Sequence, residues 1–140
     1  MPDRIEVTLK WDTPDPAGVV LCTRLREDLG IEVAGARVID VYTINAALTP
    51  GELERVRADL FTDPITQESA VNRALARDFD YVVEVGFRPG VTDNVGKSAK
   101  EGIQDTLGRK LGANEAVFRS VQYVLRGVDR PTAERIAKQA

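Results

Sequence analysis

The sequence predicts an α+β fold built from two tandem β-α-β-α units, with a mainly antiparallel sheet and helices on one of its faces. The main observation is an internal repeat, because residues 84–108 align without a gap on residues 6–30 and six of these 25 positions are identical. About one or two identities are expected by chance. The identical pairs are Glu6/Glu84, Val7/Val85, Asp15/Asp93, Gly18/Gly96, Leu29/Leu107 and Gly30/Gly108. We therefore predict a tandem duplication, with one domain over 1–140 and repeats at 1–71 and 79–140.

The first repeat begins with alternating polar and apolar residues from Arg4 to Lys10, which is the period of a half-buried strand. Its odd-numbered residues are expected to face the core. Asp15 and Pro16 then supply an N-cap and a proline at the first helical position. The apolar stripe of this helix recurs every four residues, and Gly30 provides a left-handed stop. The stripe consists of Ala17, Leu21, Leu25 and Leu29.

The rest of the first repeat reads as a long strand, a short helix and a short strand. The strand is predicted over 33–44, with apolar residues on both faces. Thr49, Pro50 and Glu52 have the pattern of a helix start. A third strand is expected within 65–70, and the polar stretch 72–80 is expected to be a surface connection.

The second repeat follows the same order. Its strand runs from Tyr81 to Phe87, Asp93 stands where Asp15 stood, and a long strand is predicted over 116–126. The helix stripe is Val95, Ala99, Ile103, Leu107 and Leu111. Pro131 opens a last helix, but nothing in this repeat corresponds to residues 61–70. The second repeat is thus incomplete at its C-terminal end, which indicates either a longer polypeptide or two halves that differ at their ends.

Composition excludes several classes of function. The sequence has 19 lysines and arginines against 22 acidic residues, a net charge of −3, so it lacks the basic excess of a nucleic-acid binder. It has no apolar run of 18 residues, so no membrane partner is expected and we predict a cytoplasmic location. With one cysteine and no histidine, it has no internal disulfide and lacks the commonest general base and metal ligand.

Candidate chemical sites are weak. The segment from Gly90 to Ser98 resembles a P-loop, but five residues separate its glycines where a P-loop has four. We interpret it as a helix start, in which Asp93 or Asn94 is the cap and Gly96 permits close packing. Cys22 has no histidine to activate its thiol and is interpreted as a small, partly buried side chain. We predict no catalytic, cofactor-binding or metal-binding residue.

One surface is predicted to meet a partner. If the helices cover one face of the sheet, the other face carries Val38, Tyr42 and Ile44 from the first repeat and Phe118 and Val124 from the second. Such an apolar surface is expected to be covered. We therefore predict that Tyr42, Ile44, Phe118 and Val124 form an interface between the two halves, with a second copy in a homo-oligomer, or with a larger enzyme.

The residues also resemble a known family. Four segments are similar to the PurS-type subunit of phosphoribosylformylglycinamidine synthase (formylglycinamidine ribonucleotide amidotransferase), or to the PurS-like N-terminal domain of its single-chain forms. They are the opening RIEVTLK, the Asp-Pro turn, the stretch FTDPITQ and the second-copy segment VEVGFRPGVTDNVGKSAKEGIQDTLGRKLG. Trp11 departs from the family, which usually has proline there. The resemblance implies a pseudo-twofold version of the PurS dimer within one chain.

The resemblance also implies a function in purine biosynthesis. The parent enzyme is an ATP- and glutamine-dependent ligase, whose ATP and Mg are expected in its catalytic domains. The PurS-like part is a non-catalytic bridge between the synthetase and the glutaminase, so no activity is expected of this chain alone. Two alternatives stay open from the residues: a regulatory module of the ACT type that binds a small molecule through glycines within 88–96, and a self-contained enzyme with a carboxylate site.

Overall fold

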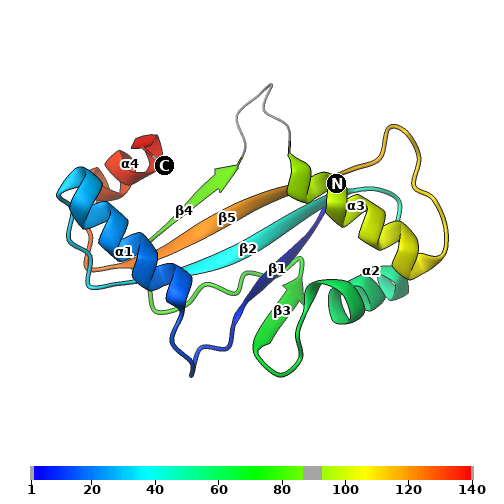
Figure 1. The fold of residues 1–140 in the computed structure, drawn as a ribbon, viewed down its shortest axis with the longest axis horizontal. Coiled ribbons are helices and arrows are strands. Elements are labelled where there is room, and N and C mark those ends of the chain that lie inside the picture. Colours follow the sequence, from blue (N-terminus) through cyan, green and yellow to red (C-terminus); the bar gives the residue numbers. More distant parts are fainter. Residues whose placement is uncertain (1, 87–92, 140) are drawn as a thin grey trace.

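The computed structural model describes residues 2–86 and 93–139. Its elements are β1 (Asp3–Leu9), α1 (Pro16–Leu29), β2 (Gly35–Asn45), α2 (Pro50–Val56), a π-helical turn η1 (Arg57–Phe61), β3 (Gln67–Val71), β4 (Tyr81–Gly86), α3 (Asn94–Leu107), β5 (Ala116–Arg126) and α4 (Arg130–Gln139). The described strands form one antiparallel sheet in the order β3-β1-β2-β5-β4 (Figure 1). The fold is therefore α+β, as predicted. None of the described helices is long and apolar enough to cross a membrane.

The ends of α1 and α3 are formed by the residues that the sequence predicted. Asp15 caps α1 by accepting a hydrogen bond from the amide of Ala17, and Asp93 caps α3 by accepting one from the amide of Gly96. Gly30 and Gly108 end the two helices with φ of 66° and 69°, a left-handed conformation that favours glycine. Helix α2 starts where the sequence predicted, and Thr49 and Glu52 form a capping box at its N-terminus.

All four helices pack on the same face of the sheet. The pairing of β1 with β2 places Ile5 opposite Tyr42, so the odd-numbered residues of β1 share a face with the even-numbered residues of β2. Two buried clusters lie on this face. One contains Ile5, Val7 and Ile44 with side chains of α2 and α3, and the other contains Val83 and Leu125 with side chains of α1 and α4.

The helices α1 and α3 pack mainly on β2 and β5 of their own halves, and their buried side chains join clusters that contain residues of both halves. Leu21 and Leu25 of α1 lie in the cluster of Val83 and Leu125, whereas α3 contributes to the cluster of Ile5 and Ile44. Figure 1 shows the result, with α1 and α4 at one end of the sheet and α2 and α3 at the other. The two halves are thereby interlocked, and neither has a complete core of its own. Both halves share caps, strand order and packing, although the duplication itself stays a prediction.

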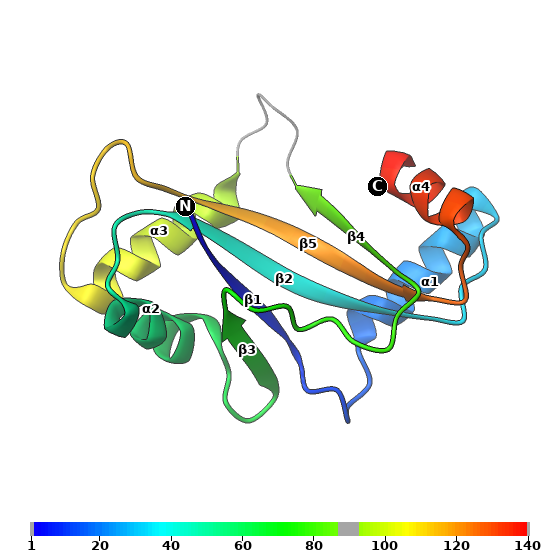
Figure 2. The same cartoon turned by 180° about the vertical axis from the view of Figure 1, so that it is seen from behind.

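The other face of the sheet carries no helix in the described part of the chain. The connection from β3 to β4 crosses it, as Figure 2 shows, because these strands lie at opposite edges of the sheet. Leu75 and Ala76 of this connection pack with Trp11 over Ile39, Val41 and Val124. The predicted surface connection thus covers part of the open face. Small differences from the expected elements are that β3 spans 67–71, that α4 begins at Arg130, and that Val95 is 40% exposed.

Candidate functional site

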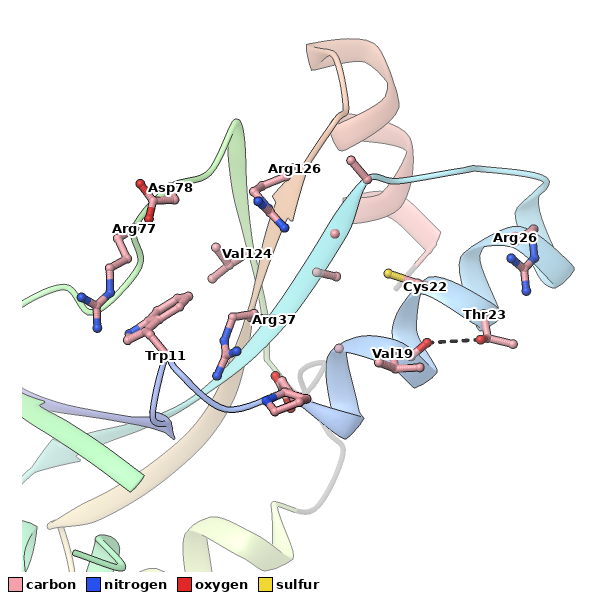
Figure 3. Close-up of a pocket in the computed structure, with 16 residues that line it drawn as sticks. Trp11, Val19, Cys22, Thr23, Arg26, Arg37, Arg77, Asp78, Val124 and Arg126 are labelled. Atoms are coloured by element: carbon pink, nitrogen blue, oxygen red, sulfur yellow. Dashed lines mark hydrogen bonds between the residues drawn. The ribbon is translucent and has the colours of Figure 1, made fainter. Parts of the chain in front are cut away.

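A groove of about 770 Å³ lies between α1 and the beginning of β2 (Figure 3). It forms because β1 pairs with β2 only as far as Asp40, which leaves the first residues of β2 without a strand neighbour on that side. Helix α1 fills part of this space. Gly18 lies so close to β2 that a Cβ added there would be 2.0 Å from the carbonyl oxygen of Ala36. We call this hollow the arginine groove, after Arg26, Arg37, Arg77 and Arg126 in its lining.

One wall of the arginine groove is built around Trp11. The guanidinium carbon of Arg37 lies 4.7 Å from the centroid of the indole ring, and that of Arg77 lies 4.8 Å from it, which are cation–π distances. Arg37 also donates hydrogen bonds to the carbonyl oxygens of Leu9 (3.0 Å) and Thr13 (2.8 Å), so it ties the turn after β1 to the sheet. Arg77 forms an ion pair with Glu68 at 2.9 Å. This wall is therefore ordered by its own contacts.

Arg126 is an exposed residue of the groove lining. Its guanidinium lies against the backbone of Gly35, where a Cβ would be 2.7 Å from one of its terminal nitrogens. Any larger residue at 35 would have to push this side chain aside. Among the described residues, no carboxylate lies within salt-bridge distance of Arg126 or Arg26.

Two acidic residues line the groove, but one is committed to the fold. The carboxylate of Asp15 is buried and accepts hydrogen bonds from the amides of Ala17 (3.1 Å) and Val38 (2.8 Å). Asp78 is the other. Cys22 also lines the groove, as a free and partly buried thiol. The groove therefore offers several cations and an apolar wall, which suits binding of an anion, and it brings together no nucleophile and general base.

The predicted interface residues do not share a surface. Val38, Tyr42 and Ile44 lie on the face that the helices cover: Ile44 is fully buried, and Tyr42 stacks on Phe61 with ring centroids 4.3 Å apart. Their placement on the open face was wrong. Both faces of β2 carry apolar side chains, and only the pairing with β1 decides which one meets the helices.

Phe118 and Val124 do lie on the open face, but they differ in exposure. Val124 is buried beneath the connection between β3 and β4, whereas Phe118 is 52% exposed. Phe118 is thus the most exposed member of the predicted set, whereas Ile44 and Val124 are buried and Tyr42 is partly buried. Whether Phe118 meets a partner stays a prediction.

The P-loop-like segment is a helix start in its described part. Asp93 accepts hydrogen bonds from the amides of Gly96 (2.7 Å) and Arg119 (2.8 Å), and a Cβ on Gly96 would lie 2.3 Å from the carbonyl oxygen of Val117. Asp93 and Gly96 therefore serve capping and close packing. Residues 87–92, which include most of the glycine-rich turn considered for an ACT-type site, lie outside the described residues.

Sequence reasoning missed the arginine groove. Its arginines are scattered from position 26 to 126 and follow no motif, so no local signal marks them. The one hint was Trp11, an unusual residue at the end of a strand. In the described part of the chain, no group of three or more acidic or cysteine side chains is arranged to hold a metal ion. Comparison with protein-family models, characterised proteins and solved structures finds no match for this chain.

Proposed function

We propose that this chain is a non-catalytic bridge of phosphoribosylformylglycinamidine synthase in purine biosynthesis. In this role it holds the ATP-dependent synthetase near the glutaminase that supplies ammonia, and it acts in the cytoplasm. The proposal starts from the resemblance of the sequence to PurS-type subunits. The structural observation that supports it best is the form of the FTDPITQ segment, residues 61–67, which is among the segments most specific to that family.

This segment forms a tightly hydrogen-bonded turn. The carboxylate of Asp63 accepts a hydrogen bond from the amide of Ile65 (2.9 Å), and its backbone carbonyl accepts one from the amide of Gln67 (2.8 Å). In return, the side-chain oxygen of Gln67 accepts a hydrogen bond from the amide of Asp63 (2.8 Å). The amide of Ile65 lowers the pKa of Asp63, because it stabilises the charged carboxylate. A further bond from the amide of Lys10 to the carbonyl of Thr66 (3.0 Å) fastens the turn to the end of β1.

The rigid turn presents an apolar side chain to the outside. Ile65 is 80% exposed, the highest value among the large apolar residues that the structure describes. Isolated exposed apolar residues are common, but this one stands on a turn that is already ordered. A partner that buries Ile65 would therefore gain apolar contact at a small cost in conformational entropy. This is the property expected of a docking point on a scaffold.

The interlocked halves support a bridging role as well. Eleven-residue strands β2 and β5 pair along their whole length at the centre of the sheet. The turn at Ile65 lies at one edge of this sheet, and Phe118 lies on its open face. A single rigid body with separate exposed apolar points can contact two partners at a fixed distance from one another.

The proposal is tested with the synthetase and glutaminase polypeptides from the same source. We expect the chain to bind at least one of them in sedimentation velocity, and to raise glutamine-dependent amidine formation by the mixture. Ile65→Asp should weaken this association by about tenfold or more, because an apolar anchor would be replaced by a charge. Val20→Asp, which alters another exposed apolar residue on α1, is the matched control and should bind normally. Absence of any association by the unaltered chain would refute the proposal.

A further inference from the structure

We propose that the arginine groove is a binding site for a small organic oxyanion, a molecule that carries phosphate or carboxylate groups on an apolar or aromatic body. The inference rests on the juxtaposition of Arg37, Arg77 and Arg126 around Trp11 and Val124 on the open face of the sheet (Figure 3). It does not depend on the bridging function proposed above.

The first argument is charge. The lining holds four arginines and two aspartates, a local excess of positive charge in a chain whose net charge is −3. Arg77 already pairs with Glu68, and Asp15 keeps its negative charge while it accepts two backbone hydrogen bonds. The positive charge left for a ligand therefore comes chiefly from Arg26 and Arg126, which have no carboxylate within salt-bridge distance in the described chain. An arginine presents a planar fork of donors that matches the oxygens of a carboxylate or phosphate. An incoming anion would therefore find both favourable potential and suitable donors.

The second argument is the state of the donors in the groove. The guanidinium of Arg126 lies close to the backbone at Gly35, and no carboxylate of the described chain pairs with it. Trp11 Nε1 and Arg37 Nε are buried and have no hydrogen-bond partner among the described residues. Buried donors without an acceptor are rare and unfavourable. A ligand oxygen that enters beside Trp11 would offer the acceptor that this wall lacks.

The third argument is size and shape. A volume of about 770 Å³ lies within the range of small-molecule sites, roughly 300–1,000 Å³. Helix α1 bounds the groove on one side, and the wall of Trp11 and Arg77 bounds it on the other (Figure 3). The exposed Val19 and the indole of Trp11 give the lining an apolar part that would contact the body of the ligand. These bounds favour a small molecule over an extended acidic peptide.

The fluorescence of Trp11 tests the inference directly, because it is the only tryptophan in the chain and lies in the groove wall. The full chain is titrated at low ionic strength with citrate, AMP and inorganic phosphate, and with uncharged adenosine. We expect saturable changes with citrate or AMP, weaker ones with phosphate, and none with adenosine. Preference for citrate or for AMP then distinguishes carboxylate from phosphate recognition.

Variants show whether the groove is responsible. Arg126→Gln and, separately, Arg26→Gln should each weaken binding, by about tenfold for Arg126, because charge-assisted hydrogen bonds are lost. Arg55→Gln removes the same charge from an exposed position on α2, outside the groove, and should bind like the unaltered chain. Thermal unfolding verifies that each variant is folded.

Three outcomes would overturn the inference. The first is the absence of saturable binding by citrate and AMP. The second is equal weakening in Arg126→Gln and Arg55→Gln, which would mean that only net charge matters. The third is binding of a glutamate-rich peptide but of none of the small anions, which would assign the groove to an acidic protein segment instead.

Discussion

Replacement of Asp15 by alanine should destabilise the chain strongly, although this residue takes part in no proposed chemistry. Its carboxylate joins the start of α1 to the first part of β2, since one oxygen accepts a hydrogen bond from the amide of Ala17 and the other accepts one from the amide of Val38. Loss of a helix cap costs about 1 kcal/mol. The amide of Val38 would also lose its partner in a partly buried place, which costs about 1–3 kcal/mol. We expect the free energy of unfolding to fall by about 2–4 kcal/mol.

Urea unfolding followed by circular dichroism measures this change, and the melting temperature should drop by roughly 10 °C for a chain of this size. Asp15→Asn keeps one acceptor and should lose less. Asp12→Ala, at an exposed position in the same turn, is the matched control and should change stability by less than about 0.5 kcal/mol. If Asp15→Ala were as stable as Asp12→Ala, the interpretation of Asp15 as a helix-to-strand link would be refuted.

Two further predictions concern packing and charge. Gly18→Ala should lower the free energy of unfolding by about 1–3 kcal/mol, because the added Cβ would lie 2.0 Å from the carbonyl oxygen of Ala36. Gly51→Ala is the control and should be close to neutral in the same thermal unfolding assay, since the nearest atom to its added Cβ is 3.9 Å away. Arg4 and Glu84 join the two halves by hydrogen bonds of 2.6 and 3.1 Å, and a double-mutant cycle with Arg4→Gln and Glu84→Gln should give a coupling of about 0.5–1 kcal/mol at pH 7. Arg4 lowers the pKa of Glu84 from its ordinary value of 4.5 in the folded chain. The stabilisation by this ion pair is therefore present above pH 4.5 and is lost as the pH falls through the lowered pKa of Glu84. A coupling energy that stayed constant into strong acid would contradict the ion pair between Arg4 and Glu84.

Much of the local structure could be predicted because it depends on residues that are neighbours in the chain. Asp15, Thr49 and Asp93 are helix caps as expected, and the strand predicted over 116–126 has the predicted bounds. Such features follow from side chains that bond to the backbone within a few residues and from the period of a pleated strand. The order of the elements and the α+β class could be predicted for the same reason.

The predicted placement of Tyr42 and Ile44 on the open face was wrong because β2 is apolar on both faces. A period of two indicates that two faces exist, but it does not say which one the helices cover. That choice was made by the register between β1 and β2, in which Ile5 lies opposite Tyr42. A shift of one residue in this register would have reversed the outcome.

The sequence by itself determined the order of the helices and strands, the caps of α1, α2 and α3, and the bounds of β5, because caps, turns and periodicity act over short distances along the chain. Only the tertiary structure decided the strand order, the buried clusters that join side chains of both halves, and the meeting of Trp11 with Arg37, Arg77 and Arg126 in one groove. These depend on pairings between residues far apart in the chain, whose energies come from register and packing and leave no local pattern in the sequence.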